Sequence, residues 1–411
     1  MRQRILSLRQ QGETLNRWLN IRMKTILPEL MERAELDMWI VIARENNEDQ
    51  ILSTLIPAPA LSARRRTILV FSRNEDGTIE RLNLGPAGSE MDLVYNSIRQ
   101  NKQDDQWLFL RNVVKKRNPK TIGVNISETF AGADGLSSTD HKNLLDALKG
   151  LDVNVISAEK VAVGWLEQRI PEELEAYHVI NRIAHDIIAE AFSSKVIVPG
   201  QTTTLDVVWW IRQRIHDLGL RAWFQPTVDV QRQGEEKPLF DTVIRGGDLL
   251  HCDVGLHYLG LSTDTQQLAY VRRPGEEEAP SEFEEALAEG NKLQDITANE
   301  FITGRTGNEI LANALEEACQ AGLKARVYTH PIGFHGHGSG PTIGLYEKQD
   351  KVAGAGEYPL YSNTCYALEL NVVTYLTKWQ QEITIPLEQT VAFSAGEVKY
   401  LGGRQSKLHL V

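Results

Sequence analysis

The sequence predicts two domains, an α/β domain over residues 1–163 and an α+β domain over residues 164–411. The chain has 411 residues, more than the roughly 250 to 300 that a single hydrophobic core usually organises. Helix and strand patterns alternate through the first part, whereas helices and strands occur in separate runs in the second. A helix-start signal at residues 168–173 marks the division between them.

The first domain begins with a helix and continues as a series of short strands. Apolar residues recur at helical spacing over residues 15–27. The uninterrupted apolar run at residues 38–43 predicts a strand buried on both faces. Further strands are expected at residues 67–71, 79–84, 121–124 and 154–156. No catalytic motif occurs in this domain, and the polar run at residues 46–49 is interpreted as a loop that starts a helix.

The second domain opens with two helices. Pro171 in the first turn, followed by Glu172 and Glu173, is typical of a helix N-terminus. An apolar stripe continues this helix through residues 180–192, and a second helix is expected to begin near Thr204. Strand and turn patterns follow Leu220. Two more helices are predicted, at residues 281–300 and 307–323.

The composition argues against two classes of partner. A net charge of -11 at pH 7 disfavours nucleic-acid binding, which needs a concentrated basic face. No segment approaches the ~18 apolar residues of a membrane-spanning helix, and the N-terminal residues lack the apolar stretch of a signal peptide. The three cysteines, Cys252, Cys319 and Cys365, lack the spacing of a disulfide framework or zinc site. We therefore expect a cytoplasmic protein without nucleic-acid or membrane partners.

Four acids in the second domain lie in segments that resemble strands or strand ends. They are Asp253, Asp264, Glu369 and Glu388. A carboxylate among apolar neighbours is costly unless a cation neutralises it. Taken singly, each acid is also compatible with an exposed turn or a strand edge. Together with one imidazole, the four oxygen donors form a ligand set suited to a pair of divalent metal ions.

The glycine-rich segment at residues 333–340 supplies the imidazole. Its glycines allow the backbone to approach a site closely. A phosphate-binding loop is disfavoured, because the segment has no following lysine and carries His335 and His337 where such a loop has small residues.

The order of these segments resembles the catalytic half of the pita-bread metallopeptidases. The strings are HCDVGLHYLGLSTDTQQ, FHGHGSGPTIG, YALELNVV and IPLEQTVAF. The family holds methionine aminopeptidase, Xaa-Pro aminopeptidase and prolidase, with creatinase as a metal-free relative. Residues 334–340 match the methionine aminopeptidase pattern of an aromatic residue, any residue, Gly-His-Gly, any residue, Gly. The first domain resembles the creatinase-type N-terminal domain by position and pattern only.

This resemblance implies a role for each site residue. Asp253 would hold one metal, His337 and Glu369 the other, and Asp264 and Glu388 would bridge both. A hydroxide between the ions would attack a peptide carbonyl, with Glu369 as the catalytic proton shuttle and His335 as a catalytic or substrate contact. The resemblance also implies a homodimer. Manganese is the metal expected first, with cobalt, zinc or iron as alternatives.

Several positions depart from the family pattern. Residues 234–238 contain no histidine where the family has a substrate-facing one, and Gly344 stands seven residues after His337, where a second histidine is usual. Pro386 and Gln389 replace the arginine and aspartate that flank the last glutamate of proline-specific members. His257, His330 and His335 are candidates to compensate, although each could be a structural histidine.

Three functions compete for this combination of features. The first is a two-metal exopeptidase that hydrolyses short peptides, similar to Xaa-Pro dipeptidases or aminopeptidases but with altered substrate positioning. The second is a weak or inactive homologue that acts as a binding module. The third, a creatinase-like amidinohydrolase, is disfavoured by the complete set of acids, since that enzyme lacks the carboxylate cage.

Overall fold

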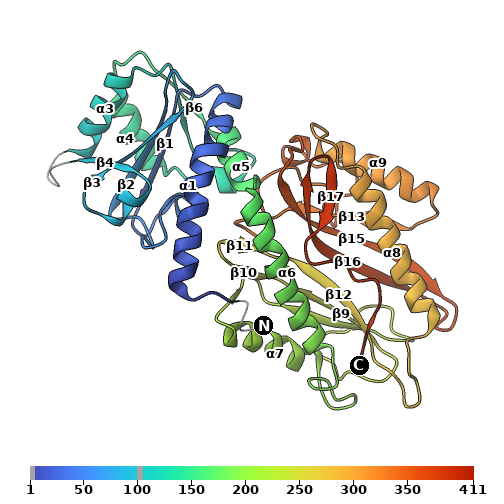
Figure 1. Ribbon diagram of the computed structural model, residues 1–411. Coiled ribbons are helices and arrows are strands. Elements are labelled where there is room, and N and C mark those ends of the chain that lie inside the picture. The colour runs from blue at the N-terminus through green and yellow to red at the C-terminus, as the bar shows by residue number, and fades with distance from the viewer. Residues whose placement is uncertain (1–4, 100–104) are drawn as a thin grey trace. The chain divides into compact units, whose positions relative to one another are not determined.

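A computed structural model describes residues 5–99 and 105–411, which form two compact units (Figure 1). The first unit is Leu6–Ile170, and the second contains Pro171–Val411. The boundary therefore lies after Ile170 and not after residue 163. The difference arises because helix α5 (Glu159–Glu167) packs on helix α1 (Leu8–Arg33) of the first unit. There the guanidinium of Arg22 stacks 4.4 Å from the Trp165 ring centroid.

The first unit is built on a six-stranded sheet with the order β4-β3-β2-β1-β5-β6. The strands are β1 (Met38–Arg44), β2 (Arg66–Arg73), β3 (Ile79–Pro86), β4 (Asn96–Arg99), β5 (Thr121–Val124) and β6 (Asn154–Ser157). The helices besides α1 and α5 are α2 (Leu52–Leu55), α3 (Gln106–Arg117) and α4 (Ser138–Leu148). All five expected strands are confirmed, and the polar run at residues 46–49 precedes α2.

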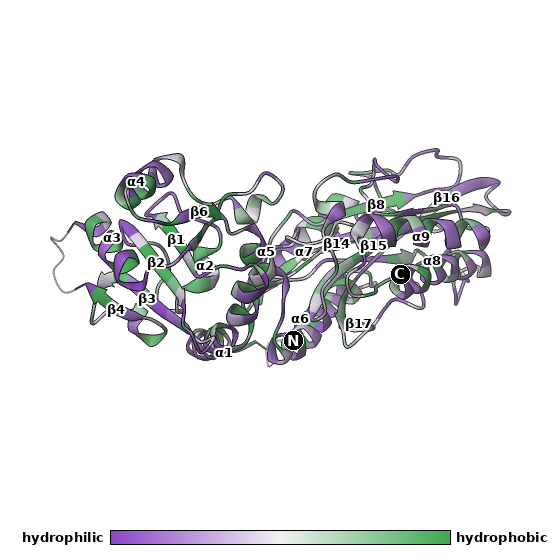
Figure 2. Cartoon of the chain, turned by 90° about the horizontal axis from the view of Figure 1, so that it is seen from above, coloured by the Kyte–Doolittle hydropathy of each residue, from purple (hydrophilic) through white to green (hydrophobic). Residues whose placement is uncertain are grey.

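Burial explains why β1 has no alternation of apolar and polar residues. Residues 38–43 of this strand are all buried, between β2 on one side and β5 on the other. In Figure 2 helices α3 and α4 carry both hydrophobic and hydrophilic colours. This mixture is expected for helices that place one face on a sheet and the other in solvent.

The second unit contains a nine-stranded sheet whose main path is β13-β15-β16-β12-β9-β8, while β14, β17 and β18 pair with β15, β16 and β12. The strands are β8 (Thr227–Gln231), β9 (Leu249–Val254), β12 (Thr265–Tyr270), β13 (Ala325–Val327), β14 (His330–Pro331), β15 (Thr364–Leu376), β16 (Gln381–Ser394), β17 (Glu397–Tyr400) and β18 (His409–Leu410). A separate three-stranded sheet has the order β11-β10-β7, with β7 (Arg221–Ala222), β10 (Leu256–Tyr258) and β11 (Leu261–Ser262).

Four helices of this unit confirm the predicted ones. They are α6 (Pro171–Ala191), α7 (Thr204–Asp217), α8 (Ser281–Asn299) and α9 (Gly307–Gln320). Helix α8 packs on β15 and β16, whereas α6 packs on β9 and β12. No helix in residues 5–99 and 105–411 combines the length and apolar character needed to cross a membrane.

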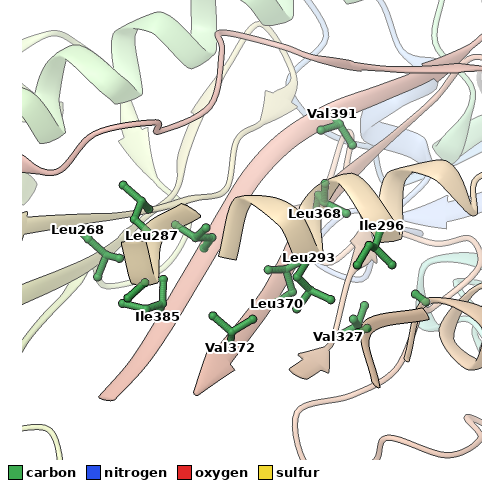
Figure 3. Packing of buried hydrophobic residues seen from close by; sticks show 14 of the residues in the cluster. Leu268, Leu287, Leu293, Ile296, Val327, Leu368, Leu370, Val372, Ile385 and Val391 are labelled. Carbon is green, nitrogen blue, oxygen red and sulfur yellow. The ribbon is translucent and has the colours of Figure 1, made fainter. Parts of the chain in front are cut away.

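The core beneath α8 determines which strand residues face away from it. Side chains of α8 such as Leu293 meet Leu368, Leu370 and Val372 of β15 (Figure 3). Successive side chains of a strand point to opposite faces of the sheet. Glu369 therefore faces the side opposite α8, and the packing of the helix fixes which face of the sheet carries the acids.

Candidate metal centre

Adjacent strands bring the four predicted acids together. Asp253 of β9 is level with Gln266 of β12, and Gln266 is level with Glu388 of β16. Glu388 in turn is paired with Glu369 of β15. Asp264 directly precedes β12. The sheet register thus places acids from four consecutive strand segments at one point.

The distances are suitable for metal ligands. Single oxygen atoms of Asp253, Asp264 and Glu388 lie within 4.8 Å of one another. The Nε2 atom of His330 lies 3.5 Å from Glu388 Oε1, 3.8 Å from Asp264 Oδ2 and 3.9 Å from Glu369 Oε2. The structure therefore joins all four predicted acids with a histidine that the sequence did not single out as a ligand.

His330 and His337 both reach this cluster, but in different ways. His337 falls within 4.8 Å of Asp264 and His330, and its ring lies 4.7 Å from that of His330. Its side chain is exposed, whereas His330 is only 13% exposed and faces three acids. His337 also lies seven residues after His330. The family pattern has two histidines seven residues apart. When His337 is taken as the first, Gly344 stands in the second position. When His330 is taken as the first, His337 is the second, and both histidines of the pattern are present.

The electrostatics of the cluster favour a bound cation. Burial, followed by the charge of Glu388, raises the pKa of Glu369 to about 9. Burial also raises the pKa of Asp253 to about 6, and it raises those of Asp264 and Glu388 well above their usual range. Among the described residues, Asp253 Oδ1, Asp264 Oδ1 and Glu388 Oε1 are buried oxygens without a hydrogen-bond partner. Such orphaned oxygen atoms fit divalent metal ions, which would neutralise the acids.

Three polar residues next to the acids, Gln266, His251 and Asp229, were not predicted from the sequence. Gln266 donates hydrogen bonds from Nε2 to Glu369 Oε1 (2.6 Å) and Glu388 Oε2 (3.1 Å). His251 contacts Gln266 through Nε2 and Asp229 through Nδ1. Burial opposes the charged imidazole, but Asp229, Asp253 and Gln266 together outweigh it and raise the pKa of His251. For His251 the sequence did contain a signal. Side chains alternate between the two faces of a strand, so residues 251 and 253 of β9 lie on the same face.

A pocket of about 430 Å³ adjoins the acid cluster at His337. Trp223, Phe334 and His335 line it, together with Arg221, Ala222, His257, Ser262, Gly336 and His337. His335 therefore lines the pocket and does not lie among the acids, and its role as a substrate contact stays a prediction. His257 lies there too, where burial, followed by Arg221 and His335, lowers its pKa to about 4.

Gly336 is required for the shape of this pocket. A Cβ atom at this position would lie 2.2 Å from the indole of Trp223, whose Nε1 donates to Thr263 O at 2.8 Å. We expect Gly336→Ala to displace the indole, to lower stability by about 1–3 kcal/mol and to change the tryptophan fluorescence. Gly12→Ala is the control, because its Cβ would meet only Ala58 at an ordinary 3.4 Å. Unchanged fluorescence and stability in Gly336→Ala would contradict this account of the pocket.

Two other departures from the family pattern are residues 234–238 and Pro386. Residues 234–238 are exposed and contain no histidine. Pro386 is level with Asn371 of β15, whose Nδ2 donates to the hydroxyl of Tyr328 at 3.0 Å. Burial, followed by the charge of Glu369, raises the pKa of Tyr328 well above its usual range. A neutral tyrosine hydroxyl therefore lies near the place where proline-specific relatives carry an arginine.

Comparison with known proteins agrees with this architecture. The sequence profile of metallopeptidase family M24 matches residues 175–395, more than half of the chain. No curated protein gives a significant sequence match. The structure of an X-Pro aminopeptidase from Thermotoga maritima is similar over 92% of this chain and 99% of its own, with 18% identity and a TM-score of 0.66.

Two further solved structures resemble the chain over nearly its whole length. One is an Xaa-Pro dipeptidase from Bacillus anthracis, with 13% identity, coverage of 97% and 100%, and a TM-score of 0.62. The other is the N-terminal domain of the FACT complex subunit SPT16 from chickpea, with 11% identity, coverage of 96% and 98%, and a TM-score of 0.56. The fold is thus the pita-bread fold with an added N-terminal domain, and the chain belongs to metallopeptidase family M24.

Proposed function

We propose that the protein is a two-metal exopeptidase that hydrolyses short peptides of the Xaa-Pro type, with altered substrate positioning. The observation that carries this proposal is the convergence of Asp253, Asp264, Glu369 and Glu388 with a buried imidazole. Buried acids at this density are unfavourable without a cation. The X-Pro aminopeptidase and Xaa-Pro dipeptidase among the similar structures support the choice of substrate class.

The residues divide into holding and reacting groups. Asp253 would hold one ion, Asp264 and Glu388 would lie between the two, and Glu369 with His330 or His337 would hold the second. When bound, the ions would supply a hydroxide nucleophile and polarise the peptide carbonyl. Glu369, whose pKa burial and Glu388 raise to about 9 in the metal-free protein, is the group we assign to proton transfer. The pocket at His337 would receive a substrate side chain.

The missing positioning groups define how this enzyme would differ from proline-specific relatives. Pro386 offers no charge to a substrate carboxylate. The polar groups that could contact the substrate instead are Tyr328, close to Pro386, and His335, in the pocket. Loss of one oriented contact commonly costs about 10²–10³ in kcat. We therefore propose that Xaa-Pro peptides are substrates with rates below those of relatives that keep the arginine.

A binding module without turnover is the second candidate function. The departures at Pro386, Gln389 and residues 234–238 favour it, as does the similarity to SPT16, a subunit of the FACT complex. The four intact acids oppose it, because a binding module has no evident need for them.

Metal, assembly and compartment complete the proposal. Manganese is proposed first, with cobalt, zinc or iron as alternatives, since oxygen donors with one or two imidazoles accept all of them. A homodimer and a cytoplasmic location are proposed from the family resemblance and from the three free cysteines, of which Cys252 and Cys365 are buried. Light scattering of the purified protein tests the dimer.

Elemental analysis combined with peptide assays separates the two candidate functions. The purified protein would be loaded with Mn²⁺ or Co²⁺ and offered Xaa-Pro dipeptides, longer Xaa-Pro peptides and Met-peptides. The exopeptidase proposal expects stoichiometric metal together with turnover of the Xaa-Pro peptides. Stoichiometric metal without turnover of any peptide would contradict it and support the binding module.

The two histidines are expected to contribute unequally to metal binding. His330→Ala should weaken Mn²⁺ binding strongly, because His330 faces three acids. We expect a loss of at least about 10- to 100-fold, since replacing residues that only support the ligands already causes a loss of this size. His337→Ala should weaken it less, because the side chain is exposed. Manganese retained after dialysis measures the difference. A larger loss in His337→Ala would make His337 the principal imidazole ligand.

A further inference from the structure

A buried line of hydrogen bonds leads from β8 across the sheet to the acid cluster. Asp229 Oδ2 lies 2.7 Å from His251 Nδ1, and His251 Nε2 lies 2.9 Å from Gln266 Oε1. These residues belong to the neighbouring strands β8, β9 and β12, and Asp229 is level with His251 in the sheet register. The side chains of Asp229 and His251 are only 10% and 12% exposed, so solvent does not readily replace these contacts.

The amide of Gln266 can adopt only one of its two orientations. Its Nε2 donates to Glu369 Oε1 and Glu388 Oε2, and in the ionised form that binds metal both carboxylates only accept hydrogen bonds. Its oxygen faces an imidazole nitrogen, and the other nitrogen of that imidazole faces the carboxylate of Asp229. A flipped amide would set its oxygen against two carboxylates. Asp229 therefore orients His251, and His251 orients Gln266.

The amide leaves one oxygen of each glutamate free for the cluster. Gln266 contacts Oε1 of Glu369 and Oε2 of Glu388. The opposite oxygens, Glu369 Oε2 and Glu388 Oε1, are the ones that face His330, at 3.9 and 3.5 Å. Glu388 Oε1 is also buried without a hydrogen-bond partner. The same amide thus fixes the rotation of two carboxylates and turns their remaining oxygens towards a common point.

We propose that Gln266 is a positioning residue, held in place by Asp229 and His251, that preorganises Glu369 and Glu388 for metal binding. This inference rests on the metal centre of the proposed function. Groups that hydrogen-bond to metal-ligating carboxylates typically change metal affinity or activity by about 10- to 100-fold when they are replaced. Preorganisation of this kind acts by removing the need to order the ligands during binding.

Gln266→Leu tests the proposal, with Gln267→Leu as the matched control. Gln267 is the next residue of β12, is equally buried at 4% exposure, and contacts His409 Nε2 at 2.7 Å instead of the acids. Two readouts are needed: the Mn²⁺ dissociation constant from chelator competition, and the visible absorption spectrum of the Co²⁺-loaded protein. We expect Gln266→Leu to raise the dissociation constant about 10- to 100-fold and to alter the Co²⁺ spectrum, and Gln267→Leu to do neither.

The outcomes separate this inference from the proposed function. If the unmodified protein binds none of Mn²⁺, Co²⁺, Zn²⁺ and Fe²⁺, the metal centre itself is wrong. If it binds Mn²⁺ and Gln266→Leu matches Gln267→Leu in both readouts, Gln266 has no positioning role. Should Gln266→Leu fail to fold, His251→Gln carries the same test, because it removes the imidazole that orients the amide of Gln266. Unchanged affinity and Co²⁺ spectrum in His251→Gln would then overturn the proposal.

Discussion

Glu388→Ala is expected to abolish peptide hydrolysis and to release bound metal. Glu388 is 1% exposed and lies within 4.8 Å of candidate ligand atoms of Asp253 and Asp264, and likewise of His330 and Glu369. Its removal would deprive both ions of a shared ligand, as removal of Asp264 would, whereas Asp253 and Glu369 would each hold a single ion. We expect kcat to fall by at least about 10²–10³-fold, the loss caused by removing one electrostatic contact from an active site. Metal content and initial rates on an Xaa-Pro dipeptide measure the effect.

Glu382→Ala is the matched control for this variant. Glu382 belongs to the same strand β16, is exposed, and pairs with Lys324 at 2.8 Å. An exposed ion pair contributes only about 0–1 kcal/mol, so this variant should keep both metal and activity. Glu388→Ala with unchanged metal content would remove Glu388 from the ligand set.

The metal-free protein is expected to lose stability as the pH rises from about 4 to 9. Burial raises the pKa of Asp253 from 3.8 to about 6, and burial with Glu388 raises that of Glu369 from 4.5 to about 9. The folded protein therefore keeps protons that the unfolded chain has already released, and each further pH unit weakens folding. At about 1.4 kcal/mol per pH unit, Glu369 alone corresponds to roughly 6 kcal/mol over this range.

Chemical denaturation of the metal-free protein at several pH values measures this dependence. Glu369→Gln should flatten the curve above pH 6, because the titrating group is gone while the shape is kept. Added Mn²⁺ should restore most stability at pH 8, where the acids are ionised, and little at pH 5, where protons compete with the metal. A metal-free protein whose stability rises steadily from pH 5 to 9 would contradict the proposed electrostatics.

Local patterns were sufficient to predict the helices, most strands and three of the four acids. Helix α6 combines a proline in its first turn with an apolar stripe, and β1 is a continuous apolar run. Asp253, Glu369 and Glu388 each interrupt an apolar strand, where an unpaired charge is unfavourable, whereas Asp264 precedes β12 and was singled out through the family resemblance. Such signals depend on neighbours in the sequence, and they remain valid whichever strands pair.

The residues that the sequence did not reveal depend on strand pairing. His330 reaches the acids because β14 pairs with β15 next to Glu369. Gln266 reaches Glu388 because these two residues are level in the pairing of β12 with β16. Neither register follows from the spacing along the chain, because the paired residues lie far apart in the sequence: His330 pairs with Ala367, and Gln266 pairs with Glu388. His337 was predicted as the imidazole ligand from a local motif, and the structure adds His330 as a second candidate ligand.

We propose that Asp264 and Glu388 lie between two metal ions. Anomalous diffraction at the manganese edge, from crystals grown with Mn²⁺, tests it most directly. We expect two peaks per chain, both within coordination distance of Asp264 and Glu388, with His330 beside one of them. A single peak, no peak, or peaks away from these two carboxylates would contradict it.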